Sequence, residues 1–291
     1  MVGAGLMGAQ IGAEYAIAGH DVILVTRSAA TGATAMQRAQ AAIRALVSHG
    51  LLGDDRAASA LPRLSTAQDV RAACAGRDVV VESVAEELNA KADVLDAAAR
   101  AAPDATLCSN TSSIQIAQLG EAARAPDRVL GTHYANPAIL MPLVEVIPSA
   151  HTERRRVDEV VRLLEGVGKT PMVVPDVPGF LWNRLQFALL REAARLVVEH
   201  GVDPATVDLA VRRTLGRRWS LVGPFETMAL GGRETFVKIA KLLFDEVGKP
   251  VDPSILERVD LPPPESLRAL AADRDARLIR WRKDDLEEGT T

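Results

Sequence analysis

Three glycines at the start of the chain, in the pattern Gly3-x-Gly5-x-x-Gly8, are the first residues whose types and spacing could serve chemistry. Gly3 would make a tight turn, Gly5 would let the backbone approach a pyrophosphate, and Gly8 would admit close packing of a helix on a strand. The helix that follows would direct its first N–H groups at the phosphates. Such a pattern also occurs in turns that bind nothing, but here a helix and the strand Val22–Val25 follow at suitable distances. We therefore predict a dinucleotide site that comprises Gly3, Gly5, Leu6, Met7 and Gly8.

The end of the next strand bears on which dinucleotide would bind. An NAD-binding domain usually carries an acidic residue there that bonds the ribose 2′-hydroxyl, whereas this chain has Thr26-Arg27-Ser28. Arg27 could meet the 2′-phosphate of NADP, or it could be a solvated surface arginine. The sequence therefore assigns Thr26 and Arg27 to the cofactor site and leaves NAD and NADP both open.

Strands and helices alternate after the glycine turn, which indicates βαβ units and a largely parallel sheet. We expect strands at 22–25, 78–82, 105–108, 128–132, 143–147 and 171–174, with helices at about 30–47, 86–101 and 114–123. Near Gly179 the alternation ends, and helices are expected at about 180–200 and after Pro204, Pro224 and Gly232. The fold class is therefore α/β: a Rossmann-type doubly wound domain over 1–177 and an all-α domain over 178–291, with a charged tail from about residue 265.

The first strand of this sheet is unusually short, because only Met1 and Val2 precede the glycine turn. A central strand needs about five residues, and each buried backbone group left without a partner costs about 1–3 kcal/mol. Either the natural protein begins several residues upstream, with an apolar segment that ends in Val2, or the sheet has lost its middle. The chain as given is expected to be less stable and to bind dinucleotide poorly.

The composition restricts the class of partner. The chain has 291 residues, 48% of them hydrophobic, and a net charge of −4. That charge gives no basic excess for nucleic acid or a lipid surface, so a small-molecule partner is expected. Cys74 and Cys108 fit neither a metal motif nor a disulfide framework, and no secretory leader is apparent, so we expect a cytoplasmic protein without a metal site.

Five short blocks follow one another through the middle of the chain: Val81–Lys91, Ser109–Ser113, His133–Pro137, Pro142–Val146 and Pro178–Arg184. Their order and spacing over about residues 2–240 resemble the L-3-hydroxyacyl-CoA dehydrogenase family. The segments Gly216–Met228 and Arg274–Ile279 are most similar to the lambda-crystallin branch, which includes L-gulonate 3-dehydrogenase and acts on a free hydroxy acid.

The resemblance implies roles for particular residues. His133 would be the general base that removes the 3-hydroxyl proton, a role that suits imidazole, and Glu145 would orient it. Ser112 and Asn183 would donate hydrogen bonds to the substrate oxygen, with Asn183 supplied by the helical domain. Glu86, Lys91 and Asn110 would lie on the cofactor side.

Each of these residues also has an ordinary structural explanation. Ser112 could cap a helix, Asn183 could be a satisfied polar residue, and His133 could be structural. Glu86 and Lys91 could form a solvated charge pair at a helix start. All four residues Ser112, His133, Glu145 and Asn183 occur together, which favours a site.

Three functions remain open from the sequence. The first is oxidation of a short-chain L-3-hydroxyacyl-CoA with NAD, the cofactor usual in the family. The second is oxidation of a free sugar acid or hydroxy acid, and Tyr134 and Ala135 put the shape of an acyl pocket in question because the acyl-CoA enzymes usually carry two phenylalanines there. The third is a non-catalytic, crystallin-like dinucleotide-binding protein. The resemblance also implies a homodimer that forms through the C-terminal domain.

Overall fold

The computed structural model describes residues 1–287 of the chain. Its contacts separate two compact units, one formed by Met1–Asn183 with the C-terminal stretch from Ala269, the other by Arg184–Arg268. Sequence patterns divide the chain after residue 177 instead. The contacts thus assign residues 178–183 and the last helix to the unit that holds the sheet.

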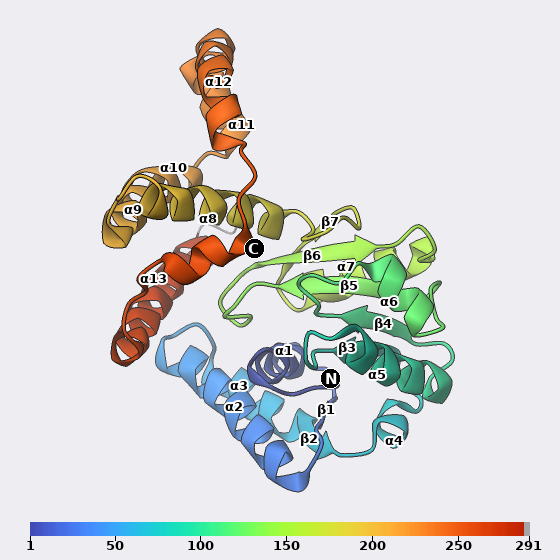
Figure 1. The fold of residues 1–291 in the computed structure, drawn as a ribbon. Helices are drawn as coiled ribbons and strands as arrows, with labels where there is room; N and C mark the ends of the chain where they lie inside the picture. The colour runs from blue at the N-terminus through green and yellow to red at the C-terminus, as the bar shows by residue number, and fades with distance from the viewer. Residues whose placement is uncertain (288–291) are drawn as a thin grey trace. The chain divides into compact units, whose positions relative to one another are not determined.

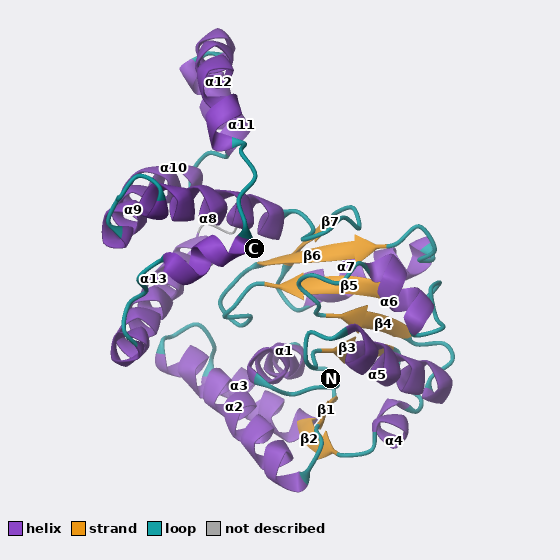
Figure 2. Ribbon diagram, viewed as in Figure 1, coloured by secondary structure: helices purple, strands orange, loops and turns teal. Residues whose placement is uncertain are grey.

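The first unit is built on a largely parallel sheet, as the sequence predicts (Figure 2). Strand β1 pairs with β2, and β3 to β7 lie side by side in chain order, with β5 and β6 as the antiparallel pair. The described strands are β1 (Val22–Val25), β2 (Leu64–Ala67), β3 (Val79–Glu82), β4 (Thr106–Ser109), β5 (Val129–Tyr134), β6 (Leu143–Pro148) and β7 (Thr170–Val173). Of these, β2 is the strand that the sequence does not predict.

Val2 takes the place of a first strand. Its N–H donates to the carbonyl of Val81 in β3 at 2.8 Å, and the N–H of Val25 in β1 donates to the carbonyl of Met1 at 2.8 Å. Val2 therefore bridges β1 and β3 and joins the two parts of the sheet. Beside this bridge, a cavity of about 570 Å³ lies between β1 and β3. β1 and β3 therefore lack a strand between them only where the cavity separates them, and Val2 pairs with both strands beside it.

Helices cover both faces of the sheet, which makes the unit doubly wound. Residues of α1, α2 and α7 share one buried apolar cluster, and residues of α4, α5 and α6 share another. Figure 1 shows α5 and α6 side by side along one face. The helices of this unit are α1 (Leu6–Ile17), α2 (Ala29–Ser48), α3 (Asp54–Ala60), α4 (Val70–Cys74), α5 (Leu88–Ala101), α6 (Ile116–Ala122), α7 (Arg154–Gly166) and α13 (Leu267–Glu287).

The second unit is helical, as predicted. Asp203 caps α9, because its carboxylate accepts the N–H of Thr206 at 3.0 Å and Pro204 stands at the first helical position. None of the helices within residues 1–287 is both long and apolar enough to cross a membrane. The elements are α8 (Trp182–Val198), which enters this unit at Arg184, then α9 (Pro204–Ala210), the π-helical η2 (Val211–Leu215), α10 (Gly216–Trp219), α11 (Pro224–Gly231), α12 (Arg233–Val247), η3 (Pro253–Arg258) and η4 (Pro264–Ser266).

Candidate active site

The glycine turn has the geometry that a dinucleotide site requires. Gly3 has a φ of 87°, and a Cβ there would lie 2.5 Å from the carbonyl oxygen of Ser83. A Cβ on Gly8 would collide with the carbonyl of Gly3. A Cβ on Gly5 would meet nothing within 4 Å, and α1 begins after Gly5 without a side-chain cap. Gly3 and Gly8 are therefore required by backbone contacts, while Gly5 leaves open space at a helix N-terminus that favours an anion.

Other predicted cofactor residues lie around this turn. Leu6 and Met7 form the first turn of α1. A cavity of about 300 Å³ lies at the end of β1, and its lining includes Thr26, Ser28 and Gln68. Within the described chain this lining holds neither acidic nor basic side chains, and Arg27 is exposed outside it. The structure thus places Thr26, but not Arg27, beside a cavity near the turn.

His133 and Glu145 face each other across the antiparallel pair β5–β6. His133 Nδ1 lies 2.8 Å from Glu145 Oε2, and the two side chains are 2% and 0% exposed. The other carboxylate oxygen, Oε1, accepts the backbone N–H groups of Leu181 at 3.0 Å and Trp182 at 2.9 Å. Because Nδ1 is engaged by the carboxylate, Nε2 is the ring nitrogen that can take a proton from a substrate.

Two aromatic rings enclose the imidazole of His133. The indole of Trp182 stacks on it, with the ring centroids 4.7 Å apart and the planes at 5°. The phenyl ring of Phe180 meets it edge-on at 5.6 Å. Phe180 lies in the turn before α8, where Gly179 and Phe180 have φ values of 76° and 51°, and Trp182 is the first residue of that helix. Since a left-handed conformation is costly for phenylalanine, the turn is held in this shape by its surroundings.

Asn183 and Ser112 also meet at this site. The Asn183 Nδ2 group donates to the backbone carbonyl of Ser112 at 3.0 Å. Asn183 follows Trp182 directly, so the residue that contacts Ser112 is fixed beside the residue that stacks on His133. Ser112 is exposed in the loop after β4, and it is not a helix cap, because α6 begins after Gln115. The structure therefore brings the four predicted catalytic residues into one linked set.

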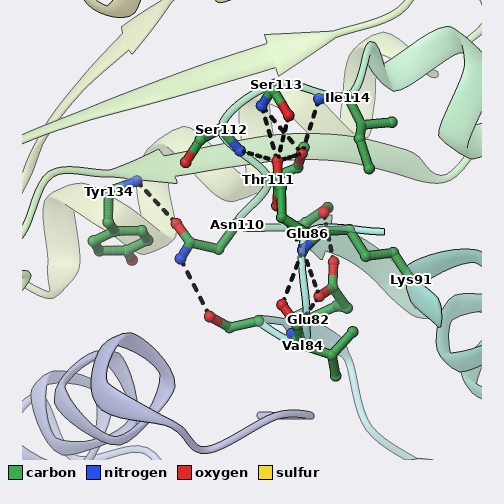
Figure 3. Close-up of polar contacts among 12 residues, drawn as sticks. Glu82, Val84, Glu86, Lys91, Asn110, Thr111, Ser112, Ser113, Ile114 and Tyr134 are labelled. Carbon is green, nitrogen blue, oxygen red and sulfur yellow. Dashed lines mark hydrogen bonds and ion pairs between the residues drawn. The ribbon is translucent and has the colours of Figure 1, made fainter. Parts of the chain in front are cut away.

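A carboxylate holds the loop that carries Ser112 (Figure 3). Glu86 Oε1 accepts the Thr111 hydroxyl at 2.6 Å and the N–H groups of Ser112 and Ser113 at 2.8 and 2.9 Å. Burial alone would raise the pKa of Glu86, but these hydrogen bonds and the charge of Lys91 outweigh it and lower the pKa. Glu86 is therefore ionised at neutral pH and anchors the Ser112 loop.

Lys91 and Asn110 extend this network. Lys91 is 1% exposed, and its ammonium lies 2.9 Å from Glu82 Oε1 and 3.2 Å from Glu86 Oε2. Asn110 donates to the Ser83 hydroxyl at 3.2 Å and accepts the Tyr134 N–H at 3.1 Å. Lys91 is thus buried, whereas Glu86 is 40% exposed, and direct contact of either residue with a cofactor stays a prediction.

Sequence reasoning missed a buried ion pair near the segment that follows His133. Lys169 pairs with Glu14 in α1, and its ammonium also donates to the carbonyls of Ala138 at 2.7 Å and Met141 at 2.9 Å. Burial raises the pKa of Glu14 to about 6. A single lysine and a single glutamate 155 positions apart carry no sequence signal that they will pair.

Comparison with known proteins decides the family. Residues 1–177 match the profile of the 3-hydroxyacyl-CoA dehydrogenase NAD-binding domain, and residues 179–261 match that of the family's C-terminal domain. The chain belongs to the 3-hydroxyacyl-CoA dehydrogenase family. It is 32% identical to human mitochondrial hydroxyacyl-coenzyme A dehydrogenase over 241 residues, which cover 81% of this chain and 76% of that protein.

A second relative matches this dehydrogenase along almost the whole length of both chains. 5-Formyl-3-hydroxy-2-methylpyridine 4-carboxylate 5-dehydrogenase of Mesorhizobium japonicum is 30% identical over 97% of this chain and 96% of its own. A crystal structure of an enzyme of that name, described as an NAD⁺-dependent dismutase, has a TM-score of 0.87, with 29% identity over 99% of this chain and 97% of its own. The structure of (S)-3-hydroxybutyryl-CoA dehydrogenase from Ralstonia eutropha has a TM-score of 0.70, with 27% identity over 94% of this chain and 92% of its own.

These comparisons bear on the remaining predictions for the dehydrogenase. The cofactor is NAD, as the family profile and the related NAD⁺-dependent enzyme indicate, and the glycine turn fits its pyrophosphate. The lambda-crystallin branch stays an expectation from the sequence.

Proposed function

We propose that this protein oxidises a hydroxyl-bearing carbon of its substrate to a carbonyl carbon, with His133 as the general base. The observation that carries the proposal is the buried His133–Glu145 pair, with Nδ1 bound to a carboxylate and Nε2 left to act. In the reaction the hydrogen on carbon leaves with its electron pair as a hydride, the O–H proton passes to Nε2, and the electrons of the O–H bond complete a C=O double bond. NAD⁺, when bound, supplies the acceptor for the hydride.

The residues around His133 have separate tasks in this proposal. Glu145 stabilises the imidazolium that forms as the proton arrives. One N–H of the Asn183 amide is used on the Ser112 carbonyl, so the second N–H and the exposed Ser112 hydroxyl are the donors for the substrate oxygen. Hydrogen bonds to an oxygen whose charge changes during hydride transfer lower the barrier in both directions.

The substrate that we propose first is a compact free acid rather than a CoA thioester. The likeness to the pyridine carboxylate dehydrogenase covers the whole chain and is structurally closer, at a TM-score of 0.87, than the likeness to the hydroxybutyryl-CoA enzyme at 0.70. Tyr134 and Ala135 also replace the two phenylalanines of the acyl-CoA enzymes, and the Tyr134 ring is buried, with its hydroxyl 3.4 Å from that of Tyr15. An aldehyde would react as its hydrate, which carries the required C–H and O–H groups and yields the acid.

A short-chain L-3-hydroxyacyl-CoA is the second candidate. Both domains match the 3-hydroxyacyl-CoA dehydrogenase profiles, and the chain carries the four residues that its resemblance to the family assigns to the reacting centre. For both candidate substrates, His133 would remove the hydroxyl proton in the same way.

A substrate panel tests the proposal. The purified full chain is assayed at 340 nm with NAD⁺ or NADP⁺ against 5-formyl-3-hydroxy-2-methylpyridine 4-carboxylate, L-gulonate and L-3-hydroxybutyryl-CoA, and with NADH against acetoacetyl-CoA. We expect the highest kcat/KM with NAD⁺ and one of the free acids, and loss of that activity in His133→Gln. A kcat/KM at least about tenfold higher for the CoA substrates would overturn the free-acid assignment while keeping the dehydrogenase.

We also propose that the second unit forms a homodimer. Its helices expose large apolar side chains, which an isolated soluble domain seldom does in such number. The most exposed large apolar side chains of this unit, at 71–84%, are those of Leu221, Phe225, Leu230, Leu242, Phe244 and Leu261. Light scattering after gel filtration should give twice the mass of the chain, and Phe225→Glu together with Leu242→Glu should give the monomer mass. A monomeric wild-type protein would contradict this assignment.

A further inference from the structure

The indole of Trp182 is placed to act on the reaction through His133. Its plane lies at 5° to the imidazole with the centroids 4.7 Å apart, so one face of the imidazole is covered by a π system. Glu145 lies at the ring edge, at Nδ1, and Phe180 meets the ring at a tilt of 60°. Within residues 1–287 the imidazole thus contacts Glu145, Phe180 and Trp182, and Glu145 is the titratable residue of the three.

We propose that Trp182 is a positioning residue that stabilises the imidazolium of His133 and fixes the plane of its ring. This inference rests on the proposed function, in which His133 gains a proton as the substrate is oxidised. The side chain of His133 is 2% exposed, so water cannot solvate the positive charge that appears there. An indole face attracts a cation, and this attraction strengthens when the cation is shielded from water.

The stack also aims the ring. Nδ1 is tied to Glu145 at 2.8 Å, a single contact that still permits rotation of the imidazole about that hydrogen bond. Contact with the flat indole removes this freedom, because an imidazole rotated about the hydrogen bond would either clash with the indole or lose contact with it. Nε2 then stays at the edge of the imidazole, in the plane of that ring, where a substrate hydroxyl can reach it without displacing Trp182.

The backbone contacts around Trp182 allow its side chain to be changed without disturbing the His133–Glu145 pair. The N–H of Trp182 donates to Glu145 Oε1 at 2.9 Å, and this bond survives any change of side chain. The turn before α8 takes its direction from the positive φ values of Gly179 and Phe180, and neither residue is altered by a substitution at position 182. Substitution of the indole should therefore leave the His133–Glu145 contact in place and remove the stacked π face alone.

The kinetic test compares side chains at this position. A cation–π contact of about 0.5–2 kcal/mol predicts that Trp182→Leu lowers kcat about 2- to 30-fold. Trp182→Phe should lose less, because it keeps a weaker π face, and the Kd for NAD⁺ should stay within about twofold in both variants. Trp281→Leu removes an indole that is 56% exposed in α13 and serves as the control. A kcat for Trp182→Leu within twofold of the wild type would refute the proposal.

A spectroscopic test needs no substrate and therefore separates this inference from the proposed function. The chain has three tryptophans, so Trp219→Phe with Trp281→Phe leaves Trp182 as the only indole. An imidazole in face contact alters the emission of an indole. We expect His133→Gln in this background to change the emission of Trp182, whereas His151→Gln, at an exposed histidine, should leave it unchanged. Emission that His133→Gln leaves unchanged, or that His151→Gln changes equally, would overturn the stacking role whatever the substrate proves to be.

Discussion

Replacement of Glu145 by glutamine isolates the chemical role of its charge. In the protein, Oε1 accepts the N–H groups of Leu181 and Trp182 while Oε2 faces His133 Nδ1. A glutamine of the same shape can keep its carbonyl oxygen on the two backbone donors. Its NH₂ group must then face Nδ1, which becomes an acceptor, so the remaining ring proton moves to Nε2. The nitrogen that should take the substrate proton is thereby blocked.

The size of the effect follows from two losses. A hydrogen bond to a charged group contributes about 1.5–3 kcal/mol, which alone corresponds to a rate loss of about 10- to 150-fold. The wrong tautomer adds to this loss, so we expect kcat for Glu145→Gln to fall by about two to four orders of magnitude. The folded state should change little, because the backbone donors keep their acceptor. Glu145→Ala, in contrast, leaves two backbone donors without an acceptor and should cost about 2–6 kcal/mol of stability.

The assay measures three quantities on each variant: kcat at 340 nm with the preferred substrate of the wild type, the Kd for NAD⁺, and the thermal midpoint. We expect Glu145→Gln to be inactive, stable and able to bind NAD⁺, and Glu145→Ala to be inactive and less stable. A kcat for Glu145→Gln within about threefold of the wild type would show that Glu145 does not set the tautomer of His133 and would remove the assignment.

The remaining predictions concern the base, the glycine turn and the buried ion pair. His133→Gln should lower kcat at least about 100-fold with an unchanged Kd for NAD⁺, and measurable turnover near the wild-type level would remove His133 as the base. Gly3→Ala should weaken NAD⁺ binding, because its Cβ would lie 2.5 Å from the Ser83 carbonyl at a φ of 87°, and calorimetric titration that gave the wild-type Kd would contradict this. The pKa of Glu14 is raised from 4.5 to about 6, so the folded state binds the extra proton and stability should fall by about 1–2 kcal/mol as the pH rises from 4.5 to 6. Glu14→Gln should flatten that part of a plot of unfolding free energy against pH, and an unaltered slope would show that another group causes it.

Much of the sheet could be predicted because its strands are short apolar runs between turn residues. The strand Val79–Glu82, for example, has almost the bounds that its sequence predicts. β2 was not predictable in the same way, because Leu64–Ala67 holds one large apolar residue and is a strand through its pairing with β1. In α7 the buried residues Val157, Val160 and Leu164 have helical spacing among charged residues, so this helix could have been predicted from its amphipathic pattern.

The residues of the candidate site were also predictable only in part. The sequence predicts His133, Glu145, Ser112 and Asn183 by type and order, and the register of β5 with β6 brings the first two together. It does not predict that Trp182 covers His133, because that contact depends on two consecutive left-handed residues, Gly179 and Phe180. A proline–glycine pair signals a turn without specifying the direction of the rings that follow.

The bridge at Val2 determines how the sheet can open. β1 and β2 pair with each other, β3 to β7 form the other part, and Val2 joins the two. This backbone connection is narrow, although Val22, Leu24 and Leu64 also share a buried apolar cluster with residues of β3 to β6. We therefore expect the amides of β1 and β2 to exchange with solvent faster than those of β4 and β5. Because the glycine turn follows directly on Val2, NAD⁺ bound there would couple the two parts. Amide protection in β1 then becomes a direct measure of how fully the cofactor site is occupied.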